Sequence, residues 1–222
     1  MRVVWLGHAC FLIEGAGLRL LTDPYQPEVL GLPPIREQVD VVIRSSADDR
    51  AHGWVEGLPG APRVVTATEV GPEGAVAAGL RIDAIPAQES LEAKAQPRDN
   101  AMYRFALEGV AIGHFGDVGN AVTPAQLARL RGIEVALVPV GGPPTIGLAD
   151  LRSALRALRP ALVIPMHYRI PGAKPRMLPV TEFTALFPAE QVEWRSDPVL
   201  RLERTRPGNG AAPRILVLPP QL

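Results

Sequence analysis

Residues 11–23 read F-L-I-E-G-A-G-L-R-L-L-T-D, two short apolar runs joined by a glycine-rich turn. This pattern predicts a β-hairpin. It returns at residues 105–117 as F-A-L-E-G-V-A-I-G-H-F-G-D, with the Phe, the Glu-Gly pair and the final Asp in register. The same offset of 94 residues aligns V-D-V-V-I (39–43) with I-E-V-A-L (133–137). Two matches at one offset predict a duplicated unit, in which Asp23 and Asp117 end equivalent strands.

The length suits one domain, or two fused halves that share a core, and the offset match places such halves at about residues 1–100 and 101–222. The chain has 222 residues, of which 47% are hydrophobic, enough for a buried core. Lys and Arg number 23 and Asp and Glu 23, so no charge excess favours nucleic acid or an anionic membrane as a partner. A single cysteine, Cys10, and the lack of a long apolar run predict a soluble, cytoplasmic protein. The oligomeric state stays open.

Apolar, partly β-branched runs predict many short strands. They lie at residues 2–6, 9–14, 18–22, 39–43, 63–66, 80–85, 101–107, 110–114, 135–140 and 161–165, with more strands at 192–218 around a loop at 207–213. A capping box, T-P-A-Q at 123–126, predicts a helix to about Arg131. Leucines at 148, 151, 155 and 158 predict a helix that ends before Pro160, and Thr181 is expected to cap a third helix through Phe187.

Polar side chains follow several of these strands. They are His8, Asp23, Asp48, Asp49, Arg50, His114, Asp117 and His167. Ligand sites of layered α/β proteins lie at such strand ends, so we expect these side chains to meet. Plainer interpretations stay open: His114 and His167 as hydrogen-bonded core histidines, Asp23 as a turn residue, and His8 as a structural residue rather than a wall of the site.

Six segments, in this order, resemble one family: W-L-G-H-A-C-F-L-I-E (5–14), L-T-D-P-Y (21–25), G-H-F-G-D-V-G (113–119), T-P-A-Q-L (123–127), V-P-V-G-G (138–142) and V-I-P-M-H-Y (163–168). Together they resemble the metallo-β-lactamase-fold hydrolases, in particular the branch that includes L-ascorbate-6-phosphate lactonase. The resemblance implies an α/β fold, a four-layer αββα sandwich built from two similar halves. It also implies hydrolysis at a zinc or manganese centre.

The metal-binding loop of that family has the form His-x-His-x-Asp-His and follows the strand equivalent to residues 39–43. Here Asp49 matches the aspartate, but Ser45, Ala47 and Arg50 stand where the three histidines would be. By resemblance, the other metal ligands are His114, Asp117 and His167. A catalytic zinc normally has three protein ligands and water, so the site is expected to hold at most one Zn or Mn ion, or none.

Arg50 cannot coordinate a cation, because a guanidinium is always protonated. We expect it instead to bridge Asp49 and Asp117 in a metal-free pocket, where an ion pair at about 4 Å contributes on the order of 4 kcal/mol. His52 could substitute as a metal ligand, which is the less favoured alternative. The remaining pocket residues by this interpretation are His8, Arg98 and Asn100.

Two functions remain open. The first is a hydrolase with an eroded site, in which Asp49, Asp117 and His167 are catalytic and the substrate is a small lactone or phosphoester. The second is an inactive, metal-free member of the family that binds a small anionic metabolite or a protein partner. Metal-free hydrolysis with a histidine as general base is a weaker third alternative. Because three histidine ligands are replaced, the sequence leaves open whether the protein is an enzyme.

Overall fold

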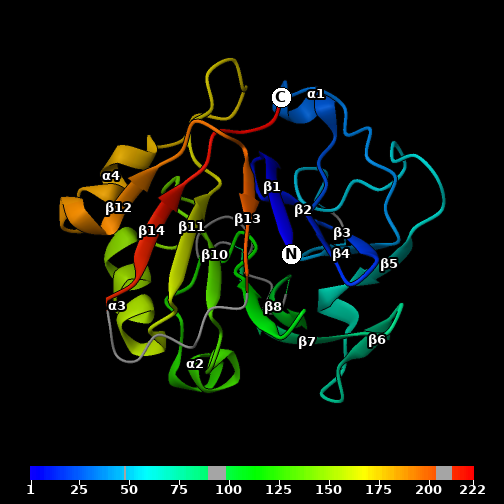
Figure 1. The fold of residues 1–222 in the computed structure, drawn as a ribbon, viewed down its shortest axis with the longest axis horizontal. Helices are drawn as coiled ribbons and strands as arrows, with labels where there is room; N and C mark the ends of the chain where they lie inside the picture. Colours follow the sequence, from blue (N-terminus) through cyan, green and yellow to red (C-terminus); the bar gives the residue numbers. More distant parts are fainter. Residues whose placement is uncertain (48, 90–98, 204–211) are drawn as a thin grey trace.

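Two mixed β-sheets pack face to face in the computed structural model, which describes residues 1–47, 49–89, 99–203 and 212–222 (Figure 1). Arg98, predicted as a pocket residue, and Asp48 lie outside these ranges. The first sheet has the order β13-β1-β2-β3-β4-β5. Its strands are β1 (Arg2–Gly7), β2 (Cys10–Gly15), β3 (Leu18–Thr22), β4 (Val41–Arg44), β5 (Arg63–Thr66) and β13 (Val199–Arg201).

The second sheet has the order β12-β14-β11-β10-β9-β8-β7-β6. From β9 to β12 neighbouring strands are parallel, and from β6 to β9 they are antiparallel. The strands are β6 (Ala75–Ala77), β7 (Leu80–Ala87), β8 (Asn100–Leu107), β9 (Val110–His114), β10 (Val135–Pro139), β11 (Leu162–Met166), β12 (Val192–Trp194) and β14 (Arg214–Val217). β10 and β11 are buried throughout, as expected of parallel strands covered on both faces.

Apolar side chains of both sheets meet in one core, in which Trp5, Phe11 and Tyr103 are fully buried. On the side of the eight-stranded sheet lie α2 (Pro124–Leu130), α3 (Leu148–Leu158) and α4 (Val180–Thr184) (Figure 1). Near the six-stranded sheet lies α1 (Pro27–Leu30), and two 3₁₀ turns occupy Ala67–Glu69 and Ala189–Gln191. The predicted α/β class, with two sheets and flanking helices, is confirmed.

Local sequence explains where the helices begin and end. Thr123 Oγ1 accepts from the Gln126 amide at 3.3 Å and Gln126 Oε1 accepts from the Thr123 amide at 2.9 Å, which confirms the predicted capping box. α3 ends at Leu158, before Pro160, as predicted. α4 differs, because its N-cap is Pro179 and not Thr181, and the helix ends at Thr184. The single-turn helix α1, which begins at Pro27, was not predicted.

The two matched stretches do form hairpins, β2-β3 and β8-β9. Their turns are Ala16-Gly17 and Glu108-Gly109, with positive φ at all four residues, as type I′ turns require. These turns lie 92 residues apart and not 94. The expectation that Asp23 and Asp117 end equivalent strands is therefore wrong by two residues: Asp23 directly follows β3, whereas Asp117 is the third residue after β9.

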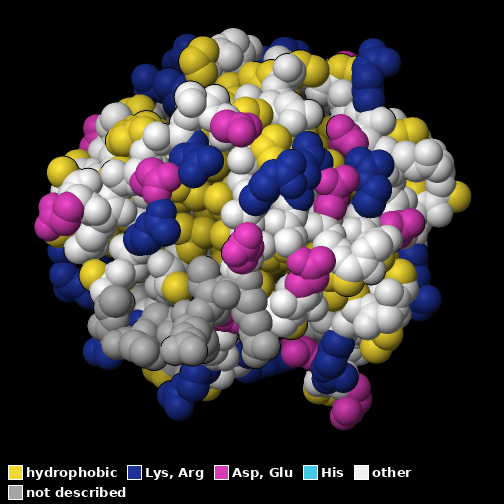
Figure 2. All heavy atoms as spheres, viewed as in Figure 1, with side chains coloured by type: hydrophobic (Ala, Val, Ile, Leu, Met, Phe, Trp, Pro, Cys, Tyr) yellow, Lys and Arg dark blue, Asp and Glu magenta, His cyan; other side chains and the backbone are white. Residues whose placement is uncertain are grey.

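The surface carries no large field of one charge on the face in Figure 2, where basic and acidic side chains are interspersed. None of the four histidines is visible there, in keeping with their burial. In the described parts of the chain, no helix is long and apolar enough to span a bilayer.

Candidate functional site

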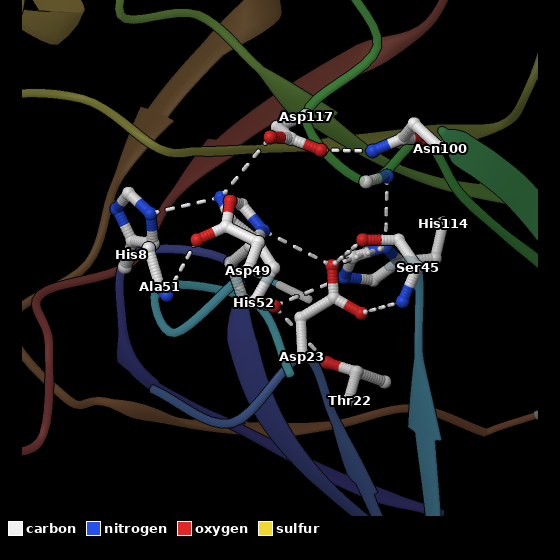
Figure 3. Close-up of polar contacts among 12 residues, drawn as sticks. His8, Thr22, Asp23, Ser45, Asp49, Ala51, His52, Asn100, His114 and Asp117 are labelled. Carbon is white, nitrogen blue, oxygen red and sulfur yellow. Dashed lines mark hydrogen bonds and ion pairs between the residues drawn. The ribbon is translucent and has the colours of Figure 1, made fainter. Parts of the chain in front are cut away.

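Titratable side chains gather where strands of both sheets end (Figure 3). β1, β3 and β4 run in one direction in the first sheet, and β9, β10 and β11 run in one direction in the second. The side chains that end or follow these strands are His8, Asp23, Asp49, His52, His114, Asp117 and His167. All are buried except Asp49, which is half-buried. The structure thus brings the predicted histidines and aspartates together and adds His52.

Three of these residues have left-handed backbones although none is glycine: His8 (φ 53°), Asp23 (φ 37°) and His167 (φ 54°). Each such conformation costs on the order of 1–3 kcal/mol and persists only where the surroundings enforce it. The carbonyl of His8 accepts hydrogen bonds from Trp5 Nε1 and from the His167 amide, both at 2.9 Å. These bonds join the ends of β1 and β11 and fix the two imidazoles beside each other.

Asp23 is a fully buried carboxylate with a complete set of donors. Its Oδ1 accepts from the Ser45 amide at 2.8 Å and from the Tyr103 hydroxyl at 3.0 Å, and its Oδ2 accepts from Ser45 Oγ at 2.7 Å. Burial opposes the charged form, but attraction to His114 and contacts with His52 and Ser45 outweigh it and lower the pKa of Asp23. Ser45 therefore anchors Asp23 through both its amide and its hydroxyl.

His52 lies at the centre of the site. Its Nδ1 is 3.3 Å from Asp23 Oδ2, and its Nε2 is 3.0 Å from His8 Nε2 and 3.6 Å from Asp117 Oδ2. Burial disfavours the imidazolium, yet the carboxylates of Asp117, Asp23 and Asp49 together raise the pKa of His52 to about 10. In the metal-free protein at neutral pH, His52 thus carries the positive charge that these carboxylates need.

The expected bridge by Arg50 is wrong. Arg50 is exposed, and its guanidinium lies 5.8 Å from the centroid of the Trp54 ring. Within the described ranges no ion pair joins Arg50 to Asp49 or Asp117. The physical reason is local: the loop after β4 turns His52 inward, and its buried imidazole occupies the space between the carboxylates.

Only one carboxylate oxygen of Asp117 contacts Asn100. Asn100 Nδ2 donates to Asp117 Oδ1, which leaves Oδ2 facing His52. Burial raises the pKa of Asp117 to about 7; attraction to His52 opposes this, and repulsion from Glu89, Asp49 and Asp23 adds to it. Asn100 therefore lies beside the carboxylate, where a pocket residue was predicted.

His114 points to the backbone with both ring nitrogens. Its Nε2 donates to the Ala9 carbonyl at 3.0 Å, and its Nδ1 accepts from the Gly116 amide at 3.0 Å. Its ring stacks on Tyr103 with centroids 4.7 Å apart. This geometry matches the plainer interpretation of His114 as a hydrogen-bonded core residue. Its assignment as a metal ligand stays a prediction.

Two groups of side chains present ligand atoms that all lie within 4.8 Å of one another. One is Asp49, His52 and Asp117, and the other is His8, His52 and His167. Burial and the nearby His52 charge lower the pKa of His167 to about 3, and burial with repulsion from His167 and His52 lowers that of His8 well below its usual range. Both imidazoles are therefore neutral at pH 7 and keep a lone pair.

Residues 2–167 match the sequence profile of the Beta-lactamase superfamily domain. The chain belongs to the metallo-β-lactamase superfamily. Within it, a UPF0173 metal-dependent hydrolase of Thermofilum pendens is 31% identical over 191 residues, covering 75% of this chain and 83% of that protein. A UPF0173 metal-dependent hydrolase of Thermococcus onnurineus is 31% identical over 194 residues, covering 76% and 84%. These relatives place the chain in the UPF0173 family.

A solved structure from Thermotoga maritima, named as a Zn-dependent hydrolase of the metallo-β-lactamase superfamily, has 30% sequence identity to the chain. It superimposes with a TM-score of 0.76 and covers 98% of this chain and 97% of that one. The metallo-β-lactamase fold implied by the sequence motifs is thus confirmed over nearly the whole chain.

The donor set of this metallo-β-lactamase-fold protein fits a divalent cation. Ligands about 2.0–2.1 Å from a tetrahedral zinc lie about 3.3 Å from one another. The distances from His52 Nε2 to His8 Nε2 and to Asp117 Oδ2, 3.0 and 3.6 Å, fall on either side of that value. His167 Nδ1 is buried and accepts no hydrogen bond from any other described residue. Neutral imidazoles beside carboxylates are the ligands that zinc and its neighbours prefer.

Sequence reasoning undervalued His52 and His8 as donors. The signal for His52 was present, since it is the one histidine in the loop after β4. Its inward direction depends on contacts that no motif encodes: its amide donates to the Asp49 carbonyl at 3.1 Å, and a Cβ on Gly53 would lie 2.7 Å from the Ser46 carbonyl oxygen. Glycine at position 53 allows the tight turn that buries His52.

Proposed function

We propose that this protein is a hydrolase of small lactones or phosphoesters that works with one divalent metal ion, zinc or manganese. The observation that carries the proposal is the convergence of ligand atoms from Asp49, His52 and Asp117 within 4.8 Å, beside His167. The metal dependence in the names of the UPF0173 relatives supports it. The substrate class rests on the motif resemblance to the lactonase branch.

A bound metal ion would polarise the carbonyl or phosphoryl oxygen of the substrate and lower the pKa of water. The chain's own residues hold and move protons around it. Asn100 fixes Asp117 Oδ1, so Oδ2 is the oxygen left to hold the metal ion; in the metal-free protein a pKa of about 7 lets Asp117 take up or release a proton near neutral pH. Asp23 holds His52 through Nδ1 and keeps Nε2 directed at Asp117.

A second candidate is an inactive protein that binds a small anionic metabolite or a protein partner without metal. One observation favours it: the contacts of His52 with Asp23 and Asp117 already neutralise the carboxylates without a metal ion. In either case we propose a cytoplasmic protein that binds neither nucleic acid nor membrane, in keeping with the balanced charge.

The test is elemental analysis of untagged protein made with zinc and manganese in the medium, followed by assays on a panel of lactones and phosphoesters. We expect about one metal ion per chain and hydrolysis that Asp117→Asn abolishes. Asp150→Asn is the matched control, because Asp150 is exposed in the first turn of α3. Metal-free, inactive protein would refute the hydrolase proposal and support the second candidate.

A further inference from the structure

His8 lies outside the ligand group of the proposed function, yet it contacts that group directly. Its Nε2 is 3.0 Å from His52 Nε2, and its ring centroid is 4.6 Å from that of His52 and 4.1 Å from that of His167. The His52 and His167 rings are stacked at 5.2 Å. Three buried imidazoles from three distant segments of the chain therefore meet at one point.

Such a contact is unusual without a shared proton or a shared cation. Two ring nitrogens at 3.0 Å can share only one proton, so one of them must present a lone pair to the other. The same separation is close to the distance of about 3.3 Å between two nitrogens on one tetrahedral zinc ion. The two nitrogens are thus already spaced as ligands of a single ion.

Asp23 selects the nitrogen that His52 offers. Metal-binding histidines commonly donate their second ring N–H to a carboxylate, which fixes the tautomer and turns the other nitrogen to the metal. Here Nδ1 of His52 faces Asp23 Oδ2 at 3.3 Å, and Asp23 is itself held by Ser45 and Tyr103. Nε2 is left for His8 and Asp117.

The other two imidazoles are held in place by the backbone. The hydrogen bond from the His167 amide to the His8 carbonyl joins their left-handed residues. Gly141 lies against His167, and a Cβ at that position would be 2.1 Å from the His167 carbonyl oxygen. His167 Nδ1 has no partner from another described residue. Backbone contacts therefore hold the His8 and His167 segments together, and one buried ring nitrogen of the cluster has no partner among the other described residues.

We propose that His8, His52 and His167 form a three-nitrogen metal site, with Asp117 as its oxygen neighbour and Asp23 as the residue that positions His52. This inference rests on the proposed function in requiring that the protein binds a divalent cation. It differs in its ligands, because His8 and His167 join His52 in place of Asp49, and none of the three imidazoles comes from a position of the His-x-His-x-Asp-His pattern at residues 45–50. Three imidazoles favour zinc, cobalt or nickel over magnesium or calcium.

The test is a titration of chelator-treated full-length protein with Co²⁺, read by visible absorption. We expect one equivalent to bind with the intense bands of a four-coordinate site. His8→Asn and His167→Asn remove an imidazole while tolerating the left-handed backbone, and each is expected to weaken Co²⁺ binding by at least about 100-fold. Asp150→Asn is the control, because Asp150 is exposed in the first turn of α3 and lies outside the cluster, and it should leave the spectrum unchanged.

The outcomes separate the two proposals. If the wild type binds none of Co²⁺, Zn²⁺ and Mn²⁺, the metal-dependent function and this inference both fail; if it binds Mn²⁺ alone, only this inference fails. If the wild type binds metal and His8→Asn binds equally well with the same spectrum, only this inference fails. If the variants do not fold, X-ray absorption of the wild-type zinc protein decides: three imidazoles per zinc support the site, and fewer than three overturn it.

Discussion

Replacing His52 with glutamine should destabilise the metal-free protein strongly, by an amount that depends on pH. A pKa of about 10 in the folded protein, against 6.5 in the unfolded chain, corresponds to about 5 kcal/mol at about 1.4 kcal/mol per pH unit. Because the folded pKa is raised, this stabilisation is complete below pH 6.5 and is lost as pH rises to about 10. At pH 7 about 4 kcal/mol remains.

The expected cost of His52→Gln at pH 7 is about 3–4 kcal/mol, within the range for removing one partner of a buried ion pair. It falls somewhat below the full value because Asp117 can take up a proton when the imidazolium is gone. The assay is urea unfolding of chelator-treated wild type and variant between pH 6 and pH 10. The difference in unfolding free energy should shrink to below about 1.5 kcal/mol by pH 9.

His114→Gln is the control. It also removes a buried histidine, but the pKa of His114 is lowered by burial, despite attraction to Asp23, so its cost should not shrink between pH 7 and pH 10. A difference for His52→Gln that stays below about 1 kcal/mol, or that is the same at pH 7 and pH 10, would show that His52 does not neutralise these carboxylates.

Three further changes test other parts of the site. Gly141→Ala should displace His167 and lower the melting temperature, since the added Cβ would lie 2.1 Å from the His167 carbonyl oxygen. Gly71→Ala is the control, because the space around Gly71 is open, and it should leave the melting temperature unchanged. Equal melting temperatures for the two variants would contradict the packing argument. Arg50→Ala should cost less than about 1 kcal/mol in urea unfolding, the size of an exposed cation–π contact, and a larger loss would restore the bridging role. Asp23→Asn should weaken Zn²⁺ affinity about 10- to 100-fold in chelator competition, and an unchanged affinity would remove Asp23 from the positioning of His52.

The strands of the fold could be predicted because their signals are local. Apolar runs bounded by glycine gave β2, β3, β8 and β9 within a residue or so, and Thr123 with Gln126 marked the start of α2. The hairpin equivalence failed by two residues because the sequence match aligned Glu14-Gly15 with Glu108-Gly109. In the first hairpin the turn itself is Ala16-Gly17. Identical residues in two aligned sequences need not occupy equivalent positions of a turn.

The location of the candidate site could be predicted from the sequence, but the side chain that pairs with its buried carboxylates could not. Strand ends gave the positions of His8, Asp117 and His167, since those depend on sheet direction. Which cation lies between the carboxylates depends on the path of a short loop, and sequence spacing alone favoured Arg50 over His52. The outcome is decided by burial: a flat imidazole fits a fully enclosed space and keeps two hydrogen-bonding edges, whereas a guanidinium there would leave donors without partners.

The absence of histidine at positions 45, 47 and 50 therefore does not by itself exclude metal binding. Carboxylates as deeply buried as Asp23 and Asp117 need a cation for the fold to be stable, whether or not catalysis occurs. A histidine can meet that need in two ways: as an imidazolium without metal, or as a neutral ligand that brings a metal ion in its place. An arginine can meet it in only one. With His52 at its centre, the site can still bind a metal ion, whereas an arginine such as Arg50 in the same place could not coordinate one.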